Sequence, residues 1–432
     1  MQREALRDDR AWELVESLAT EIGPRMAGSE GDRRAVEWAR QRFLALQFDR
    51  VWLEHVSFPL WRRQSESAAL VSPVNQPLAV TALGGSPGTG GPIRGEVVHF
   101  PDLAALEAAA PDSLEGKIAF ISQRMQRTRD GLGYMAAVDK RSHGPFVAAE
   151  QGALALLIRS VGTDAEGPPH TGQMSTQRAG EPVPAAALSN ADADRVEEML
   201  AGGLPVVITL DLDCGFDGMG ESRNVIGEFD GSGDTGGFVV VGAHLDSWDL
   251  GTGAVDDGSG VAITMAAARL VAELPERPRH GIRVVLFANE EQGVYGGKAY
   301  AAAHRSEWGR HVLAAESDLG AGRIWSFRTR TAADAQPAVQ QLADLLAPLD
   351  IAWDAERPAF GGADLSQMRR LGVPVVDLQQ DASRYFDVHH SASDTLAAVD
   401  PADLRQNVAA WATLIYWAAS SDVALGPIAP TH

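Results

Sequence analysis

The sequence has a single cysteine, Cys214, among its 432 residues. An intramolecular disulfide is therefore excluded, and so is a zinc site built from several cysteines. Any metal bound by this chain must be held by His, Asp and Glu side chains. The sequence also lacks an apolar run of about 20 residues, the length that a membrane-spanning helix needs, so we expect no membrane span.

Positive charge is scarce as well. The 37 Lys and Arg residues are outnumbered by 58 Asp and Glu residues, which gives a formal net charge of −21 at pH 7. Such acidity argues against nucleic acid or an anionic membrane surface as the main partner. Bound metal could neutralise part of this charge, although an ordinary acidic protein surface explains most of it.

Residues 1–4 and those that follow lack the apolar core of a signal peptide. Composition does not decide between a cytosolic protein and a mature exported protein whose leader has been removed. With 432 residues the chain is too long for one ordinary domain. We therefore expect two domains, or one domain that carries a large insertion.

The first sixty residues predict two helices and a strand. Apolar residues at helical spacing stop before Gly23, and Ser29 offers a cap for a second helix. A β-like run that begins at Val51 is expected to end at Pro59, which has no backbone N–H to donate.

The sequence pattern changes over residues 57–217, where short β-like runs alternate with turn-rich stretches. This pattern is typical of a self-contained α+β module, and we find no cluster of catalytic residues in it. We predict an inserted, non-catalytic domain at 57–217, and a catalytic domain formed by residues 1–56 and 218–432.

Strands and helices alternate in the remainder of the chain. A short strand is expected at 224–229, and the apolar runs 238–243, 282–288 and 312–315 are typical of strands buried on both faces. An apolar helix at 261–274 separates the first two of these runs. The alternation predicts an α/β fold with an open, mostly parallel sheet and helices on both faces.

Metal-binding residue types follow these strands. In open parallel sheets, functional side chains gather past the carboxyl ends of the strands. The residues found there are His244, Asp246, Glu290, Glu291 and Asp318, with His389 and His390 in a later loop. Together these side chains suit zinc.

The first of these strand ends contains a His-x-Asp pair. Alternate strand residues point the same way, so the carboxylate of Asp246 can reach the ring of His244, fix its tautomer and make it a better ligand. The glycine-rich loop that follows lets Asp256 approach the same metal. Asp257 could instead cap the next helix, and we assign it a supporting role.

Glu290 and Glu291 are adjacent in sequence and follow the second buried strand, 282–288. Neighbouring side chains diverge there, so one can bind metal while the other faces the substrate. A free carboxylate beside a metal-bound water can remove its proton and later deliver one to a leaving amine. Two solvated glutamates are the alternative, which the preceding apolar strand and the following glycines disfavour.

Five motifs occur in a fixed order along the chain: His244-Leu245-Asp246-Ser247-Trp248-Asp249, Gly253-Ala254-Val255-Asp256-Asp257-Gly258, Glu290-Glu291-Gln292-Gly293, Glu316-Ser317-Asp318 and His389-His390-Ser391-x-x-Asp394-Thr395. In this order they resemble the co-catalytic zinc aminopeptidase and carboxypeptidase family, and within it the carboxypeptidase Q subfamily. Segments 23–29 and 59–62 resemble that subfamily too, and segments 114–118 and 183–186 resemble a protease-associated domain.

The resemblance implies a zinc-dependent exopeptidase fold with two zinc ions, for which cobalt or manganese could substitute. One zinc would be held by His244 and Asp318 and the other by Glu291 and His390, with Asp256 as the bridge. Glu290 would be the general base and Asp246 the carboxylate behind His244. His389 would polarise the substrate carbonyl or stabilise the oxyanion. Asp364 would lie near the substrate, or would simply be a turn carboxylate.

The implied function is hydrolysis of dipeptides or short peptides with free N-termini, by attack of a metal-bound water. A homodimer and a periplasmic or secreted location are also implied. An amidohydrolase acting on N-acyl amino acids or xenobiotic amides is the main alternative. A glutaminyl cyclase would need a single-zinc site, and the full set of bridging ligands argues against it. A non-catalytic relative would be expected to have lost ligands, whereas every expected ligand is present in this sequence.

Overall fold

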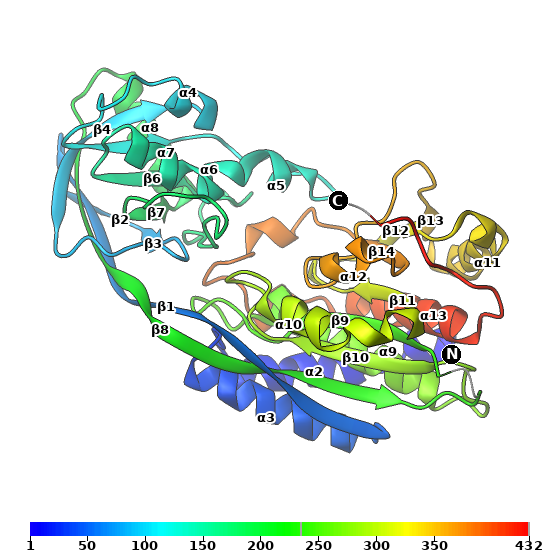
Figure 1. Cartoon of the computed structure of the whole chain (residues 1–432). Helices are drawn as coiled ribbons and strands as arrows, with labels where there is room; N and C mark the ends of the chain where they lie inside the picture. Colours follow the sequence, from blue (N-terminus) through cyan, green and yellow to red (C-terminus); the bar gives the residue numbers. More distant parts are fainter. Residues whose placement is uncertain (234–235, 431–432) are drawn as a thin grey trace. The chain divides into compact units, whose positions relative to one another are not determined.

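A computed structural model describes residues 1–233 and 236–430 (Figure 1). Contacts within the chain define two compact units. Unit 1 comprises Met1–Phe58, Gly220–Tyr385 and Asp394–His432, and unit 2 comprises Pro59–Met219 and Phe386–Ser393. The two main boundaries lie two residues beyond those expected for an inserted domain, and unit 2 also includes a short segment from late in the chain.

Unit 1 is built on a sheet with the strand order β13-β12-β14-β11-β9-β10-β8, in which β8 is Val207–Phe229. The central strands β14, β11, β9 and β10 are parallel to one another, whereas β12 pairs antiparallel with β14 and β8 pairs antiparallel with β10. The α/β class and the mostly parallel sheet are thereby confirmed. The strands are β9 (Phe238–His244), β10 (Gly281–Phe287), β11 (His311–Glu316), β12 (Ile324–Arg330), β13 (Ala352–Trp353) and β14 (Val375–Gln380).

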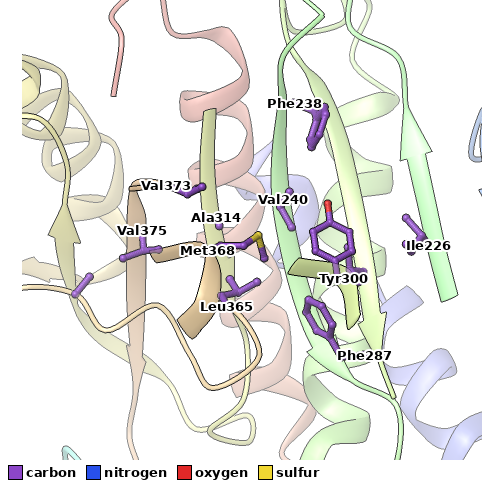
Figure 2. Close-up of a cluster of buried hydrophobic side chains, with 12 residues drawn as sticks. Ile226, Phe238, Val240, Phe287, Tyr300, Ala314, Leu365, Met368, Val373 and Val375 are labelled. Carbon is purple, nitrogen blue, oxygen red and sulfur yellow. The ribbon is translucent and has the colours of Figure 1, made fainter. Parts of the chain in front are cut away.

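Helices cover both faces of this sheet. On one face, Tyr300 of α10 and Met368 of α12 pack against Phe238 and Phe287 (Figure 2). Alternate strand residues point to the opposite face, where α9 and α13 contact β9 and α2 packs on α9. The helices are α1 (Gln2–Ala5), α2 (Arg10–Ser17), α3 (Glu30–Ala45), α9 (Ser259–Ala272), α10 (Tyr295–Ala303), α11 (Gln336–Leu346), α12 (Ser366–Arg370) and α13 (Pro401–Ser420). In the part of the chain that the structure describes, none of the helices combines the length and apolarity needed to cross a membrane.

The helical segment that begins with α2 ends, and helix α3 begins, where the sequence predicts, whereas the short helix α1 has no predicted counterpart. A π-helical turn extends α2 to Ile22, and the chain stops being helical at Gly23, whose φ of 76° suits glycine. Ser29 caps α3, and its hydroxyl accepts a hydrogen bond from the backbone N–H of Asp32 at 3.1 Å.

Unit 2 contains a mixed sheet in which β4, β5, β6 and β7 are parallel, β3 pairs antiparallel with β7, and the first residues of β8 pair antiparallel with β4. Short helices alternate with these strands. The elements are β2 (Gln76–Leu78), β3 (Val80–Ala82), β4 (Ile93–Phe100), α4 (Leu103–Glu107), β5 (Lys117–Ile121), α5 (Leu132–Ala137), α6 (Asp139–Ser142), α7 (Gly144–Glu150), β6 (Ala155–Arg159), β7 (Ala185–Leu188) and α8 (Asn190–Ala201).

Two long strands run from one unit into the other, namely β1 (Arg50–Ser72) and β8 (Val207–Phe229). The predicted strand end at Pro59 is therefore wrong, and the short strand expected at 224–229 is the last part of the much longer β8. Pro59 is exposed on a strand that pairs with β8 and β2, and an edge position tolerates a missing N–H. The middle of β8 is polar and mostly exposed, so hydrophobic periodicity does not reveal it.

Candidate metal centre

In unit 1, three predicted ligands come together at the carboxyl ends of neighbouring strands. The Nε2 atom of His244, the last residue of β9, lies 3.1 Å from Oδ1 of Asp256 and 3.4 Å from Oδ1 of Asp318, two residues beyond β11. One ligand atom from each of the three residues lies within 4.8 Å of the others. A nitrogen and two carboxylate oxygens at this spacing can share one metal ion.

Asp394 fixes the loop that contains Asp256. Its two carboxylate oxygens accept hydrogen bonds from the backbone N–H groups of Val255 at 2.7 Å and Asp256 at 3.1 Å. Its carbonyl accepts a third from Thr252 at 2.8 Å. Burial, together with the nearby charge of Asp256, raises the pKa of Asp394 to about 7. Asp394, from the motif that begins with His389 and His390, therefore supports the loop that contains Asp256.

The adjacent carboxylates Asp256 and Asp257 face different partners. Asp256 faces the ring of His244, whereas Asp257 accepts from the His244 backbone N–H at 3.1 Å. The other oxygen of Asp257 accepts from the N–H of Gly260, in the first turn of α9, at 3.0 Å. Asp257 thus ties the strand end to the helix that follows.

The ring of His244 is oriented by a backbone carbonyl. Its Nδ1 lies 3.0 Å from the carbonyl oxygen of Asp246 and 3.7 Å from the carboxylate, which is beyond hydrogen-bonding distance. Because a carbonyl can only accept, Nδ1 carries the proton and Nε2 keeps its lone pair for a metal. The predicted contact between the Asp246 carboxylate and the His244 ring is therefore not formed. The main-chain carbonyl of Asp246 makes the contact instead.

The carboxylate of Asp246 supports Glu290 instead. It accepts a hydrogen bond from the backbone N–H of Glu290 at 3.0 Å. Burial, with the neighbouring carboxylates of Asp318 and Glu291, raises the pKa of Glu290 well above its usual value. Glu290 remains partly exposed, while Glu291 is buried. A carboxyl group with a raised pKa and solvent access is suited to exchanging protons with a substrate.

His389 and His390 belong to the late segment of unit 2. Their rings stack with centroids 3.5 Å apart. The His389 carbonyl accepts from Nδ1 of His170 at 2.5 Å, and the His390 carbonyl accepts from the Thr171 N–H at 2.9 Å. His170 in turn contacts Asp164 at 2.6 Å through Nε2. Residues of the region expected to be non-catalytic therefore hold the histidine pair.

Comparison with known proteins gives the family. The model of Peptidase family M28 matches residues 224–415. Carboxypeptidase Q of Bos taurus is 34% identical over 94% of this chain and 85% of its own length. Human carboxypeptidase Q (Homo sapiens) is 32% identical over the same shares of the two chains. This chain belongs to peptidase family M28.

Solved structures agree with this assignment. The M28 peptidase precursor of Shewanella amazonensis SB2B is 46% identical and superposes with a TM-score of 0.97, covering 100% of this chain and 97% of that one. A zinc aminopeptidase of Bacillus subtilis, 18% identical with a TM-score of 0.70, covers 97% of both chains and shows the shared fold. The M28 family and these relatives make this chain a zinc metallopeptidase.

Sequence analysis missed Arg25 as part of the M28 site. Its fully buried guanidinium donates to the carbonyls of Leu245 at 2.5 Å, Thr252 at 2.8 Å and Gly253 at 2.8 Å. Both ends of the loop before Asp256 are therefore attached to one side chain. In the sequence, segment 23–29 shows only a family resemblance, since nothing there links Arg25 to carbonyls more than 200 residues away.

Two further acidic residues of unit 1, Glu316 and Asp364, are buried. The carboxylate of Glu316 accepts from the N–H groups of Asp364 at 3.3 Å and Leu365 at 3.1 Å. Burial, with the charge of Asp318, raises the pKa of Glu316 to about 8. Asp364 accepts from the Gly297 N–H at 2.9 Å. This contact joins the Asp364 loop to α10, and neither role expected for Asp364 is decided by it.

Proposed function

We propose that this M28 peptidase is an exopeptidase that hydrolyses dipeptides or short peptides with free N-termini, with Glu290 as its general base. One observation carries the proposal: His244, Asp256 and Asp318 bring ligand atoms within 4.8 Å of one another, in the same unit as Glu290, whose backbone N–H is held by Asp246. The relatives named above are a carboxypeptidase and an aminopeptidase, both of which act at chain ends.

The donors of unit 1 fit zinc, because they combine an imidazole nitrogen with carboxylate oxygens at ligand spacing. Cobalt or manganese would suit the same donors. We assign His244 and Asp318 to one ion, Glu291 and His390 to the other, and Asp256 to both. Bound zinc would supply Lewis acidity, which polarises a carbonyl and lowers the pKa of water.

The side chains supply the proton transfers. Glu290 takes a proton from the attacking water and returns it to the leaving amine, so that the peptide bond is replaced by a carboxylate and an amine. Asp246 keeps Glu290 in place through its backbone N–H. We assign His389 to the substrate carbonyl, where a donor stabilises the developing oxyanion.

A hydrolysis screen tests this function. Free dipeptides, their N-acetylated analogues and N-acyl amino acids are each incubated with zinc-loaded protein, with Glu290→Gln as the control for contaminating peptidases. We expect the unblocked dipeptides to be cleaved roughly 100-fold faster than the blocked ones, because a buried site built for a charged amine rejects its neutral analogue. Faster cleavage of N-acyl amino acids would replace this proposal with an amidohydrolase.

Three further expectations complete the proposal. Unit 2 is proposed to contain a protease-associated domain, which the segments 114–118 and 183–186 support by resemblance. A homodimer and a periplasmic or secreted location rest on the same resemblance. Light scattering of the purified protein and fractionation of the producing cells test the last two.

A further inference from the structure

Arg141 of α6 is a buried cation whose hydrogen-bond partners are all neutral. Its side chain, in a residue 5% exposed, donates to the Thr171 carbonyl at 3.4 Å and to the Tyr134 hydroxyl. Its Nε atom has no hydrogen-bond partner among the described residues. Arg159 in the same unit, 1% exposed, pairs with Asp194 at 2.7 Å and Glu197 at 2.9 Å. Buried cations are usually paired in this way, so Arg141 stands out.

Arg141 lies beside the histidine pair, within unit 2. A Cβ atom placed on Gly172 would be 2.2 Å from Nη1 of Arg141 and 2.7 Å from Nδ1 of His390, so the two side chains border the same glycine. The ring of Tyr134 meets His389 edge-on, with centroids 5.3 Å apart, and stacks on Phe386 at 5.1 Å. The Arg141 guanidinium therefore lies next to the ring of Tyr134 and to His390, a proposed zinc ligand.

A second buried cation adds to the positive charge of this region. Lys140, fully buried, donates to the carbonyl of Gln123 and has no carboxylate partner among the described residues. Burial, with the charges of Arg159 and Arg141, lowers the pKa of Lys140 to about 7. In a chain with a net charge of −21, a buried guanidinium without a carboxylate partner, next to a lysine that is about half protonated at pH 7, favours an anionic ligand.

We propose that Arg141 binds the free α-carboxylate of the substrate and thereby selects peptides that end one residue after the cleaved bond. In a dipeptide, three covalent bonds separate the attacked carbonyl carbon from the carboxylate carbon, a distance of about 4 Å. An arginine beside a zinc ligand can reach that carboxylate, and a guanidinium binds it through two parallel, charge-assisted hydrogen bonds. The inference rests on the proposed exopeptidase function and names the part of the substrate that is recognised.

Two substrates that differ only at this carboxylate provide the test. The ratio kcat/KM is measured for alanyl-alanine and for alanyl-alaninamide with the zinc-loaded wild type, Arg141→Met and Arg141→Lys. We expect Arg141→Met to lose roughly 100-fold on the acid and less than about 3-fold on the amide, with Arg141→Lys in between. Arg178→Met is the matched control, because Arg178 lies in the same unit and pairs with Glu150 at 3.0 Å. It should change neither value.

An equal loss on both substrates would mean that Arg141 only holds the histidine pair in place, and no loss on the acid would also overturn the proposal. If Arg141→Met does not fold, Tyr134→Phe removes the hydroxyl that accepts from Arg141 and keeps the cation. This variant should lose several-fold on the acid alone, and any other pattern contradicts the assignment.

Calorimetry separates this inference from the proposed function. Free L-alanine and L-alaninamide are titrated into the zinc-loaded wild type and Arg141→Met. The wild type should bind alanine at least about 10-fold more tightly than the amide, and Arg141→Met should bind both equally. This result needs no turnover, so it stands even if no peptide is hydrolysed. Equal binding of the two ligands by the wild type would exclude the carboxylate site.

Discussion

Glu290 owes its chemical properties to its surroundings. An exposed glutamate is ionised at neutral pH and binds protons weakly, whereas burial beside Asp318 and Glu291 raises the pKa of Glu290. The hydrogen bond from its N–H to Asp246 fixes the backbone from which the side chain projects. Sequence alone could place two adjacent acids after a strand, but it could not tell which of them would be partly exposed.

Replacement of Glu290 tests its role directly. Glu290→Gln keeps the shape of the side chain and removes its ability to accept a proton, so kcat should fall at least about 100-fold. Zinc content, measured by mass spectrometry, should equal that of the wild type, because Glu290 is not a proposed ligand. Retention of more than a few per cent of the activity would contradict the assignment of Glu290 as the base.

Lys140 predicts a pH dependence of stability. Its pKa is about 7 in the folded protein and near 10.5 when unfolded. The unfolded chain therefore binds more protons between these values, so folding stability rises with pH across this window and is lost as pH falls toward 7. Lys140→Met should remove this penalty, which amounts to roughly 1–4 kcal/mol at pH 6.

Urea unfolding of Lys140→Met and wild type at pH 6 and pH 10 measures the effect. The increase in the free energy of unfolding of Lys140→Met over wild type should be larger at pH 6 than at pH 10. Lys117→Met, at a partly buried lysine of the same unit, is the comparison. Equal stabilisation at both pH values would show that Lys140 is paired in solution.

At the scale of elements, burial decides what the sequence reveals. Strands β9, β10 and β11 are buried on almost every residue, so continuous apolar runs predict them to within about two residues. The long strands β1 and β8 escape prediction because their exposed middle parts carry polar side chains and depend on pairing with a neighbour.

The loop between β9 and Asp256 depends on Arg25. In Arg25→Met the carbonyls of Leu245, Thr252 and Gly253 lose their buried donor. We expect the free energy of unfolding to fall by roughly 3–5 kcal/mol, and zinc affinity to fall about 10–100-fold because the loop no longer holds Asp256.

Denaturant titration and zinc competition with a chelator measure the two effects. Arg33→Met, on the exposed face of α3, should leave both unchanged. Normal zinc affinity in a destabilised Arg25→Met protein would limit Arg25 to a role in folding.

At the scale of the whole molecule, we expect about two zinc ions per chain. Because zinc would bind the folded state, free zinc at 100 times its Kd should stabilise the protein by about 2.7 kcal/mol, and chelation should lower Tm. Inductively coupled plasma mass spectrometry and differential scanning calorimetry provide the measurements. A reproducible value near one zinc per chain with full activity would contradict the bridged site.

Sequence analysis could not find the partners of the histidine pair. Motif order predicts His390 as a ligand, but His170 and Thr171 contact its loop from about 220 residues away in the chain. Their contacts are main-chain hydrogen bonds, which leave no mark on residue type. Nor could composition reveal Arg141, since an arginine looks the same whether or not a carboxylate lies beside it.

The two long strands have a consequence for how this protein can evolve. His55 pairs with Glu221 at 3.0 Å within unit 1, and Arg62 lies 3.5 Å from Asp217 within unit 2, so β1 and β8 are neighbours on both sides of the boundary. A short turn from Phe58 to Gly220 would close them into a hairpin, a position where lineages gain and lose insertions readily. Such a deletion would also remove the residues that hold the loop of His390. We therefore expect the segment between Phe58 and Gly220 to be inherited together with His390, the proposed ligand whose loop it holds.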